Sequence, residues 1–250
     1  MNTTFEDLLA FHEESEADIT MVYSKKKMDE IDQTTTLTPR HVFLGISENG
    51  LVTEIEAGPR QPKTDNFYMD ILVMRRELLI QLVDDAYAQN YHDFNRDVLQ
   101  RYVANQHLRI CGYEYKGYNR RVETINSYYA LNMDLIKAEP RRELFGVNPV
   151  FTKIRDEVPA RYMPGAKVVN SLVADGCVIE GTVENSVLFR GVYVGPNTHI
   201  KNSILMQEDN IEEGVELEGV ILDKQVTVKR NERLIAPTNY PIVIGKNTTI

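Results

Sequence analysis

The sequence predicts a chain of two folded parts, an α/β domain followed by a left-handed parallel β-helix. Strand-like and helix-like segments alternate over residues 1–138, which is typical of a three-layer α/β domain. Over residues 166–250 a motif of Asn-Ser and two aliphatic residues recurs at intervals close to one triangular coil of three hexapeptides. Residues 139–165 lie between these parts, and we expect them to form a linker that packs the two parts together.

The repeat sets the expected register of the β-helix. Its copies begin at Asn170, Asn185 and Asn202, 15 and 17 residues apart, and a fourth copy begins at Glu218 after a further 16 residues. Parallel strands that are stacked coil on coil bury β-branched residues between neighbouring coils. The expected inward-facing column is Val173, Val178, Val183, Val187, Val192, Ile200, Ile204, Ile211, Val215, Val220 and Val226.

A helix, a buried strand and a hairpin are expected first in the α/β domain. Thr4 opens a capping-box pattern, which predicts a helix to about Ser15. Residues 19–23 form an apolar run that predicts a buried strand. Asn49 and Gly50 separate two further apolar runs, and Asn-Gly tolerates the positive φ that a tight hairpin turn needs.

The rest of the domain is expected to contain two strands and three helices. Their apolar residues fall at the spacing of a half-buried strand or an amphipathic helix. The expected elements are a strand at 66–74, a helix at 75–89 with Leu78, Leu79, Leu82, Val83 and Ala86 inward, a helix at 93–105 capped by Asp93, a strand at 108–115 and a helix capped by Thr124 that reaches Lys137.

Four prolines interrupt the linker. They are Pro140, Pro149, Pro159 and Pro164. Proline removes a backbone donor and fixes φ, so we expect an extended path over a surface rather than one continuous helix.

Composition excludes several function classes. The 250 residues carry a net charge of −9, and no run of Lys or Arg is longer than Lys25–Lys27, which argues against a nucleic-acid interface. Acidic residues interrupt every apolar run near Met1, so there is no signal-peptide pattern, and no stretch reaches the roughly 18 apolar residues of a membrane helix. Cys111 and Cys177 are expected to be reduced, buried thiols. Together these features favour a cytoplasmic protein.

Motifs for nucleotide or nucleophilic chemistry are absent from the sequence. There is no G-x-G-x-x-G or G-x-x-x-x-G-K loop, no H-E-x-x-H and no G-x-S-x-G. His92 and Asp93 are adjacent and could act as an acid/base pair, but a helix cap at Asp93 and a structural role for His92 are the favoured interpretation.

Three charged features have alternative interpretations. Arg120 and Arg121 lie at a predicted strand-to-helix connection, where they could hold a phosphate or form an ion-paired loop. His199 could serve as the histidine base of a β-helix acyltransferase, but a structural role within the repeat is favoured. An acidic stretch could attract a metal, although a solvated face of the β-helix is favoured; its residues are Glu208, Asp209, Glu212, Glu213, Glu216 and Glu218.

The order of these pieces resembles bacterial glucose-1-phosphate adenylyltransferases, also called ADP-glucose pyrophosphorylases. The resemblance rests on residues 91–97, residues 118–124, the Tyr-rich helix at 127–135 and the β-helix that follows. Residues 17–23 and 170–179 are more similar to the GlgD-type regulatory subunit. The resemblance implies a partial nucleotidyltransferase domain with a Rossmann-like three-layer fold, and it implies that about the first third of a family member is missing.

The resemblance also allows the family's binding positions to be checked. The Glu-Lys-Pro sugar-phosphate motif falls on Glu56 and Ala57, so the cation is lost. Elsewhere a Ser-Met-Gly segment falls on Tyr68 to Asp70, and the second metal-binding Asp falls on Arg121, a cation that cannot hold Mg²⁺. The positions that the resemblance assigns to substrate binding, in degenerate form, are Glu56, Ala57, Tyr68, Asp70, His92, Asp93, Arg120 and Arg121.

The resemblance therefore implies a regulatory subunit with no catalytic residues and no metal site of its own. Its partner would be a catalytic adenylyltransferase subunit that makes ADP-glucose and pyrophosphate from ATP and glucose 1-phosphate with Mg²⁺ in glycogen biosynthesis. We expect a hetero-oligomer, as a tetramer, or self-association, with sugar-phosphate or nucleotide effectors and without nucleic acid or membrane. The alternatives are an active sugar-phosphate nucleotidyltransferase when full length, and a β-helix acyltransferase.

Overall fold

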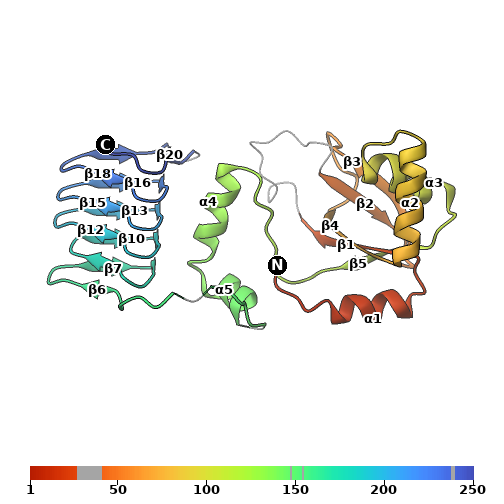
Figure 1. The fold of residues 1–250 in the computed structure, drawn as a ribbon, viewed down its shortest axis with the longest axis horizontal. Coiled ribbons are helices and arrows are strands. Elements are labelled where there is room, and N and C mark those ends of the chain that lie inside the picture. The colour runs from red at the N-terminus through yellow and green to blue at the C-terminus, as the bar shows by residue number, and fades with distance from the viewer. Residues whose placement is uncertain (27–40, 147, 154, 238–239) are drawn as a thin grey trace. The chain divides into compact units, whose positions relative to one another are not determined.

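The computed structural model describes residues 1–26, 41–146, 148–153, 155–237 and 240–250 (Figure 1). They form two compact units, Thr3–Gly117 and Tyr118–Ile250, and Met1–Asn2 belong with the second. The predicted boundary at residue 138 thus falls one helix later than the division between the units, because the helix that follows Thr124 groups with the β-helix. No helix within the described ranges is long and apolar enough to cross a membrane.

The first unit is built on a five-stranded sheet of order β3-β2-β4-β1-β5. β1 pairs antiparallel with β4 and parallel with β5, whereas β2 and β3 form the predicted hairpin, with Gly50 at φ 78° in its turn. The strand bounds are β1 Ile19–Lys25, β2 Val42–Ile46, β3 Val52–Ala57, β4 Asn66–Met74 and β5 Ile110–Glu114.

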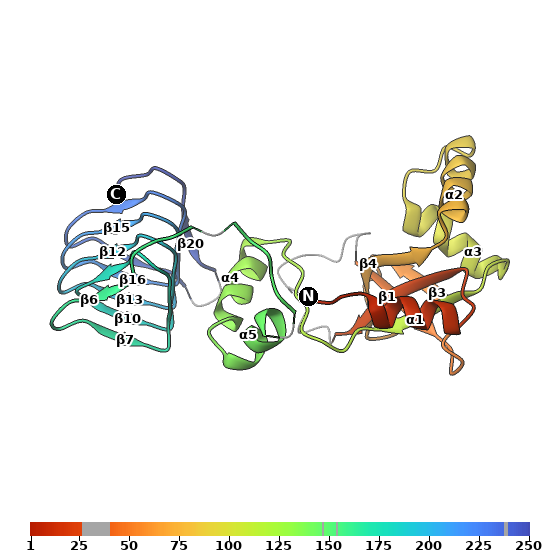
Figure 2. The same ribbon diagram turned by 60° about the horizontal axis from the view of Figure 1, so that its bottom comes forward.

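Helices cover both faces of this sheet, which confirms the predicted three-layer arrangement (Figure 2). On one face, buried Leu82, Leu99 and Val103 pack with Ile19 and Met21 of β1. The opposite face is covered by the first helix, as described next. The helices are α1 Glu6–Glu14, α2 Arg76–Ala88, the π-helical turn η2 Phe94–Leu99 and α3 Gln100–Asn105.

α1 lies on the second face through an aromatic and a polar contact. The ring of Phe11 meets Tyr113 edge-on at 5.3 Å, and His12 Nδ1 lies 2.8 Å from Thr20 Oγ1. The predicted cap at Thr4 is wrong: the residue before the helix is Phe5, which has a left-handed φ of 63° and makes no side-chain capping bond. Within the helix, Leu8 is the buried residue.

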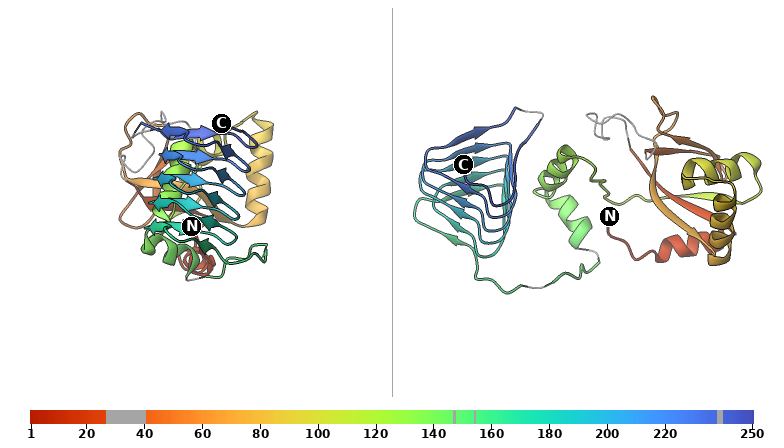
Figure 3. Two further views of the ribbon diagram at one scale, coloured as in Figure 1. Left: turned by 90° about the vertical axis from the view of Figure 1, so that its left-hand side faces the viewer. Right: turned by 45° about the horizontal axis from the view of Figure 1, so that its top comes forward.

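The second unit contains a parallel β-helix of three five-stranded sheets, and its stacked coils are clear in Figure 3. Short strands recur with corners between them, as the hexapeptide pattern predicts. The bounds are β6 Arg161–Tyr162, β7 Lys167–Val169, β8 Leu172–Val173, β9 Val178–Ile179, β10 Thr182–Glu184, β11 Val187–Leu188, β12 Tyr193–Val194, β13 His199–Lys201, β14 Ile204–Leu205, β15 Asn210–Ile211, β16 Glu216–Glu218, β17 Val220–Leu222, β18 Thr227–Val228, β19 Arg233–Ile235 and β20 Ile242–Ile244.

The inward column was predicted correctly at most positions but not at all. Val183, Val192, Ile200, Ile211, Val215, Val220 and Val226 lie in the buried cluster, with Val173 packed against it. Val187 and Ile204 are buried but lie outside that cluster, because their neighbours Leu188 and Leu205 fill the inward positions. Val178 is likewise outside it. Where two successive residues are both aliphatic, alternation cannot tell which one points inward.

The fourth copy of the repeat is shifted by one residue from its predicted register. Ile204 of β14 pairs with Ile221 of β17, so Asn202 is equivalent to Gly219 rather than to Glu218. The corner conformation agrees, since φ is 48° at Asn202 and 68° at Gly219. Glycine takes a left-handed φ without steric cost, so it replaces the asparagine of the earlier copies.

Two helices precede the β-helix, α4 (Ile125–Asp134) and α5 (Ala138–Phe145). The capping box predicted at Thr124 is confirmed, with Ser127 as its partner. The prediction of an extended path after residue 138 is wrong for α5, because Pro140 lies in its first turn, where no backbone N–H is needed. Phe145 and Phe151, two apolar residues of the linker, are exposed. That the linker packs the two domains together therefore stays a prediction.

α4 rests on the β-helix within the second unit. Tyr129 of α4 donates its hydroxyl to the backbone oxygen of Asn202 at 2.6 Å. The neighbouring strand β14 has both of its residues, Ile204 and Leu205, fully buried. An aliphatic residue that faces outward from a coil and is still buried needs a cover, and α4 lies where it can provide one.

Candidate functional site

The eight sequence-predicted site positions are divided between the two units. Six of them lie in Thr3–Gly117, on β3, β4 and the approach to η2, and the two arginines lie in the unit that begins at Tyr118.

Glu56 and Ala57 end β3, and Glu56 is held by the loop that follows. Its Oε2 accepts the backbone N–H of Lys63 at 3.0 Å, and its Oε1 lies 3.6 Å from the Lys63 ammonium. The Lys63 ammonium also contacts Glu54, and these two carboxylates raise its pKa, Glu54 most strongly. Glu56 is therefore engaged by a lysine of its own unit, a residue that the sequence analysis did not single out.

Tyr68 is part of the core rather than of an open site. It is 2% exposed, and burial together with the nearby Asp70 raises the pKa of its hydroxyl. Asp70 itself is exposed and has a left-handed φ of 58°, at the point where the register between β1 and β4 shifts. A bulge of this kind adds residues to one strand and turns its side chains out of the regular alternation.

Glu56 and Tyr68 lie on opposite faces of the sheet. Phe43 of β2 pairs with Glu56 on one side and with Phe67 on the other, so these three side chains share a face. Tyr68, the next residue, points to the other face, where it joins the core cluster with Tyr23. The structure does not bring these two predicted positions together.

His92 and Asp93 form a helix start. Asp93 Oδ1 accepts the backbone N–H of Arg96 at 2.9 Å, which is the geometry of an N-cap. In turn, the backbone N–H groups of His92 and Asp93 donate to Asp97 Oδ2 at 3.2 and 3.0 Å. These bonds, with that from Arg96, lower the pKa of Asp97. The favoured interpretation of Asp93 as a cap is confirmed.

Arg120 belongs to an ion-paired cluster near α4. Its Nε and Nη2 lie 2.9 and 2.6 Å from Asp134 Oδ2, which also accepts the hydroxyl of Tyr118 at 3.2 Å. Burial raises the pKa of Asp134, but hydrogen bonds from Arg120 and Lys137 outweigh burial and leave that pKa below its ordinary value. The ion-paired alternative thus describes Arg120, whose charge is already balanced.

Arg121 lies where the resemblance places a metal-binding carboxylate. Its Nε is 2.8 Å from Glu123 Oε1, and both side chains are about 30% exposed. A guanidinium that is paired with the neighbouring carboxylate does not fit Mg²⁺, which needs oxygen ligands. Within the described ranges there is no group of three or more His, Cys, Asp or Glu side chains that could hold a metal ion.

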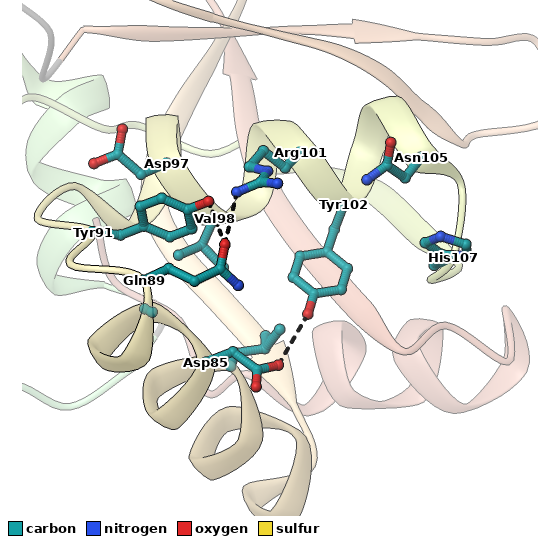
Figure 4. A pocket seen from close by; sticks show the side chains of 11 residues that line it. Asp85, Gln89, Tyr91, Asp97, Val98, Arg101, Tyr102, Asn105 and His107 are labelled. Carbon is teal, nitrogen blue, oxygen red and sulfur yellow. Dashed lines mark hydrogen bonds between the residues drawn. The ribbon is translucent and has the colours of Figure 1, made fainter.

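A shallow pocket lies between α2 and the η2–α3 segment (Figure 4). Its polar side chains bind one another: Gln89 Oε1 accepts from Tyr91 at 2.5 Å and from Arg101 at 3.1 Å, and Arg101 also lies over the Tyr91 ring. Across the pocket, Tyr102 donates to Asp85 at 3.4 Å. None of the eight predicted positions lines it, and the only sequence signal for it was the amphipathic spacing of the two helices.

The outer face of the β-helix carries the other charged candidates. His199 is exposed, and its Nε2 lies 3.8 Å from Glu184, while Glu216 pairs with Arg233 and Glu218 with Lys201. These cross-coil pairs agree with a solvated face. Asp209 does not: it is 1% exposed.

Comparison with known proteins gives a consistent set of relatives. Residues 158–235 match the family model described as GlmU-like, C-terminal hexapeptide. A glucose-1-phosphate adenylyltransferase of Acetivibrio thermocellus is 32% identical over 240 residues, which are 95% of this chain and 54% of that protein. The glycogen biosynthesis protein GlgD of Bacillus subtilis is 37% identical over 183 residues, 73% of this chain and 52% of that protein. This chain therefore spans about half the length of these relatives.

Proposed function

Because the chain belongs to the glucose-1-phosphate adenylyltransferase family, which includes GlgD proteins, we propose that it is a non-catalytic, GlgD-like subunit. In this role it binds a catalytic glucose-1-phosphate adenylyltransferase and modulates that enzyme in glycogen biosynthesis. The catalytic partner makes ADP-glucose and pyrophosphate from ATP and glucose 1-phosphate, with Mg²⁺ held by the partner's own residues.

The observation that carries the non-catalytic assignment is the Arg121–Glu123 ion pair. Nucleotidyl transfer depends on a metal ion and positioned charges that stabilise the transition state. At the family's metal position this chain has a guanidinium, and its Nε lies 2.8 Å from Glu123. A guanidinium at position 121 offers no oxygen ligand where the resemblance implies a metal-binding carboxylate.

The positions that the resemblance assigns to substrate binding in the first unit support the same proposal. Glu56 is bound by Lys63, Tyr68 is buried in the core and Asp93 caps η2. Each side chain already has a structural partner or role. A substrate phosphate would have to displace these contacts without a lysine at position 57, where this chain has alanine.

The proposal is tested by co-expressing this chain, carrying an affinity tag, with an untagged catalytic glucose-1-phosphate adenylyltransferase. We expect the catalytic subunit to co-purify and its rate of ADP-glucose formation, or its response to effectors, to differ from that of the subunit alone. Absence of co-purification together with unchanged kinetics would remove the regulatory role.

The non-catalytic part is tested separately on the isolated chain. With ATP, glucose 1-phosphate and Mg²⁺ we expect no release of pyrophosphate above the rate without protein. Turnover by the purified chain that disappears in Arg121→Ala would contradict the assignment, because it would make the arginine part of an active site.

A further inference from the structure

The pocket between α2 and the η2–α3 segment has an apolar base beneath its polar side chains (Figure 4). Leu82, Ala86 and Val98 line it, and Leu82 and Val98 belong to the buried core of the first unit. The volume of the pocket is about 160 Å³. Sites for drug-sized ligands usually have roughly 300–1,000 Å³. This pocket is therefore sized for one ring of a ligand rather than for a whole nucleotide.

The side-chain amide of Gln89 has a fixed orientation in this pocket. Its oxygen accepts from the Tyr91 hydroxyl at 2.5 Å and from Arg101 Nη1 at 3.1 Å. Because a guanidinium can only donate, the amide atom that faces Arg101 must be the oxygen. The two N–H donors of Gln89 then point away from Arg101, toward the side of Asp85 and Tyr102 (Figure 4). Among the described residues, none accepts from them.

Arg101 and Asp85 bring opposite charges to the pocket without pairing with each other. Arg101 is held by Gln89 and lies over the Tyr91 ring, 5.1 Å from its centroid. Asp85 accepts one long hydrogen bond, 3.4 Å, from the Tyr102 hydroxyl. Burial and then Asp85 raise the pKa of Tyr102, whereas Arg101 lowers it, so both charges act on that hydroxyl. Within the described part of the chain, Arg101 has no carboxylate partner and Asp85 has no cation partner.

The groups that remain free to bind a ligand are donors on one side of the pocket and an acceptor on the other. Asp97 also lines the pocket, but both of its oxygens are occupied by backbone N–H groups and by Arg96. The remaining donors belong to Gln89 and Arg101, and the remaining acceptor is the Asp85 carboxylate. A ligand that uses all three must accept on one edge and donate on the other.

This set of groups fits a neutral ring that carries hydroxyls. A hydroxyl both donates and accepts, so neighbouring hydroxyls of a sugar can bind Gln89 and Asp85 at the same time. The C–H face of the same ring is apolar and can lie against the Tyr102 ring, which stands beside Asp85 (Figure 4). A phosphorylated ligand fits less well, because its negative charge meets the unpaired carboxylate of Asp85.

We propose that this pocket binds one uncharged glucosyl ring of an α-glucan. The hydroxyls of that ring lie between Gln89, Arg101 and Asp85, and its C–H face lies on Tyr102. The pocket is shallow, so the rest of the glucan stays outside it and the chain is held at the surface of the polymer. The choice of an α-glucan among neutral sugars rests on the proposed role in glycogen biosynthesis, whereas the site itself needs no catalytic partner.

The test is the binding of maltotriose to the purified chain, measured by saturation-transfer difference NMR over a concentration series. We expect saturable, millimolar binding by the wild type. Gln89→Glu keeps the oxygen that pairs with Tyr91 and Arg101, but it replaces the two donors by an acceptor. Gln81→Glu is the matched control, because it adds the same charge to α2 outside the pocket. The dissociation constant should rise about tenfold in Gln89→Glu and stay unchanged in Gln81→Glu.

A second pair of variants keeps the proposal testable if Gln89→Glu fails to fold by circular dichroism. Asp85→Ala removes the acceptor of the pocket, and Asp84→Ala is its control on the same helix outside the pocket. Only Asp85→Ala should weaken binding of maltotriose. No saturable binding by the wild type, or binding that neither Gln89→Glu nor Asp85→Ala weakens relative to its control, would overturn the proposal.

Competition experiments test the neutral character of the ligand. Glucose should displace maltotriose at least as well as glucose 1-phosphate does, and glycine should not displace it. Stronger displacement by glucose 1-phosphate, or displacement by glycine, would assign the pocket to a charged ligand and overturn the proposal. Co-purification with a catalytic subunit involves no glucan, so failure of the glucan site and failure of the proposed function are observed separately.

Discussion

Ser203 donates its backbone N–H to the side-chain oxygen of Ser186, one coil below, at 3.1 Å. Ser186 meanwhile donates its hydroxyl to Glu184 O at 2.7 Å, so one hydroxyl serves two coils. Ser171 bonds Ser186 N–H in the same way, and Ser203 bonds Val220 N–H. The serine of the Asn-Ser repeat is thus a stacking element that satisfies a backbone donor at one corner of each coil.

This ladder predicts a graded loss of stability. Ser203→Ala should lower the free energy of unfolding by about 1–3 kcal/mol, because it leaves the buried N–H of Val220 without a partner. Ser171→Ala is the matched control at the more exposed first corner and should cost less. Urea unfolding of both variants measures the difference, and equal losses would contradict the importance of burial here.

Asp209 predicts an unusual pH dependence of stability. The carboxyl lies in the column of Cys177, Val192 and Val226, where Oδ1 accepts Val226 N–H at 2.9 Å and Oδ2 has no partner among the described residues. Burial raises its pKa to about 7, opposed by backbone N–H groups of Val226 and Met206 and aided by the charge of Asp223.

The sign follows from the raised pKa. The folded chain holds this proton up to about pH 7, whereas the unfolded chain releases it near its ordinary value of 3.8. The contribution of Asp209 to the free energy of unfolding is therefore complete below about pH 3.8. It falls by on the order of 4 kcal/mol as the pH rises from there to about 7. Denaturant titrations from pH 4 to 8 should show this fall, and Asp209→Asn should abolish it. A wild-type curve that matches the variant would contradict the burial of the charge.

Asp93 predicts a structural rather than a chemical effect of substitution. Asp93→Ala removes the cap of η2 and should cost about 1 kcal/mol of stability, whereas Asp93→Asn keeps a capping oxygen and should cost much less. Thermal unfolding of the two variants separates the cases. Equal destabilisation by both would mean that the carboxylate charge, not the cap, is what matters.

Arg121 predicts that Mg²⁺ does not bind this chain. Millimolar Mg²⁺ should leave the melting temperature unchanged, because a ligand stabilises only the state that binds it. A change of ionic strength with NaCl is the control. A rise in melting temperature that is specific to Mg²⁺ would show a metal site that the Arg121–Glu123 pair does not block.

Sequence periodicity located the elements of the fold well, because it reports which positions are buried. The hairpin at Gly50 and the capping box at Thr124 each have a local chemical signature, and both were predicted from it. Side-chain direction had no such signature at Ile204 and Leu205, where both residues are aliphatic.

The candidate site was harder to predict, because its contacts join distant residues. Lys63 forms an ion pair with Glu56, and Asp134 forms one with Arg120. No sequence motif links the two residues of either pair. Asp209 was assigned to a solvated face from the charges around it, whereas the register of the coils places it in the apolar column. Leu79 and Val83 of α2 were predicted to face inward, but they are 43% and 50% exposed. An apolar helix face predicts burial, but it does not show which part of the protein covers it.

The central proposal is that this chain acts through a catalytic partner and not by its own chemistry. The most direct test is the rate of pyrophosphate release from ATP and glucose 1-phosphate with Mg²⁺, measured for this chain alone, a catalytic adenylyltransferase alone and the co-purified pair. No turnover by the chain alone, with an altered rate or effector response in the pair, is the predicted result. Turnover by the chain alone would contradict the proposal. So would a catalytic subunit that does not bind this chain and releases pyrophosphate at the same rate with it as without it.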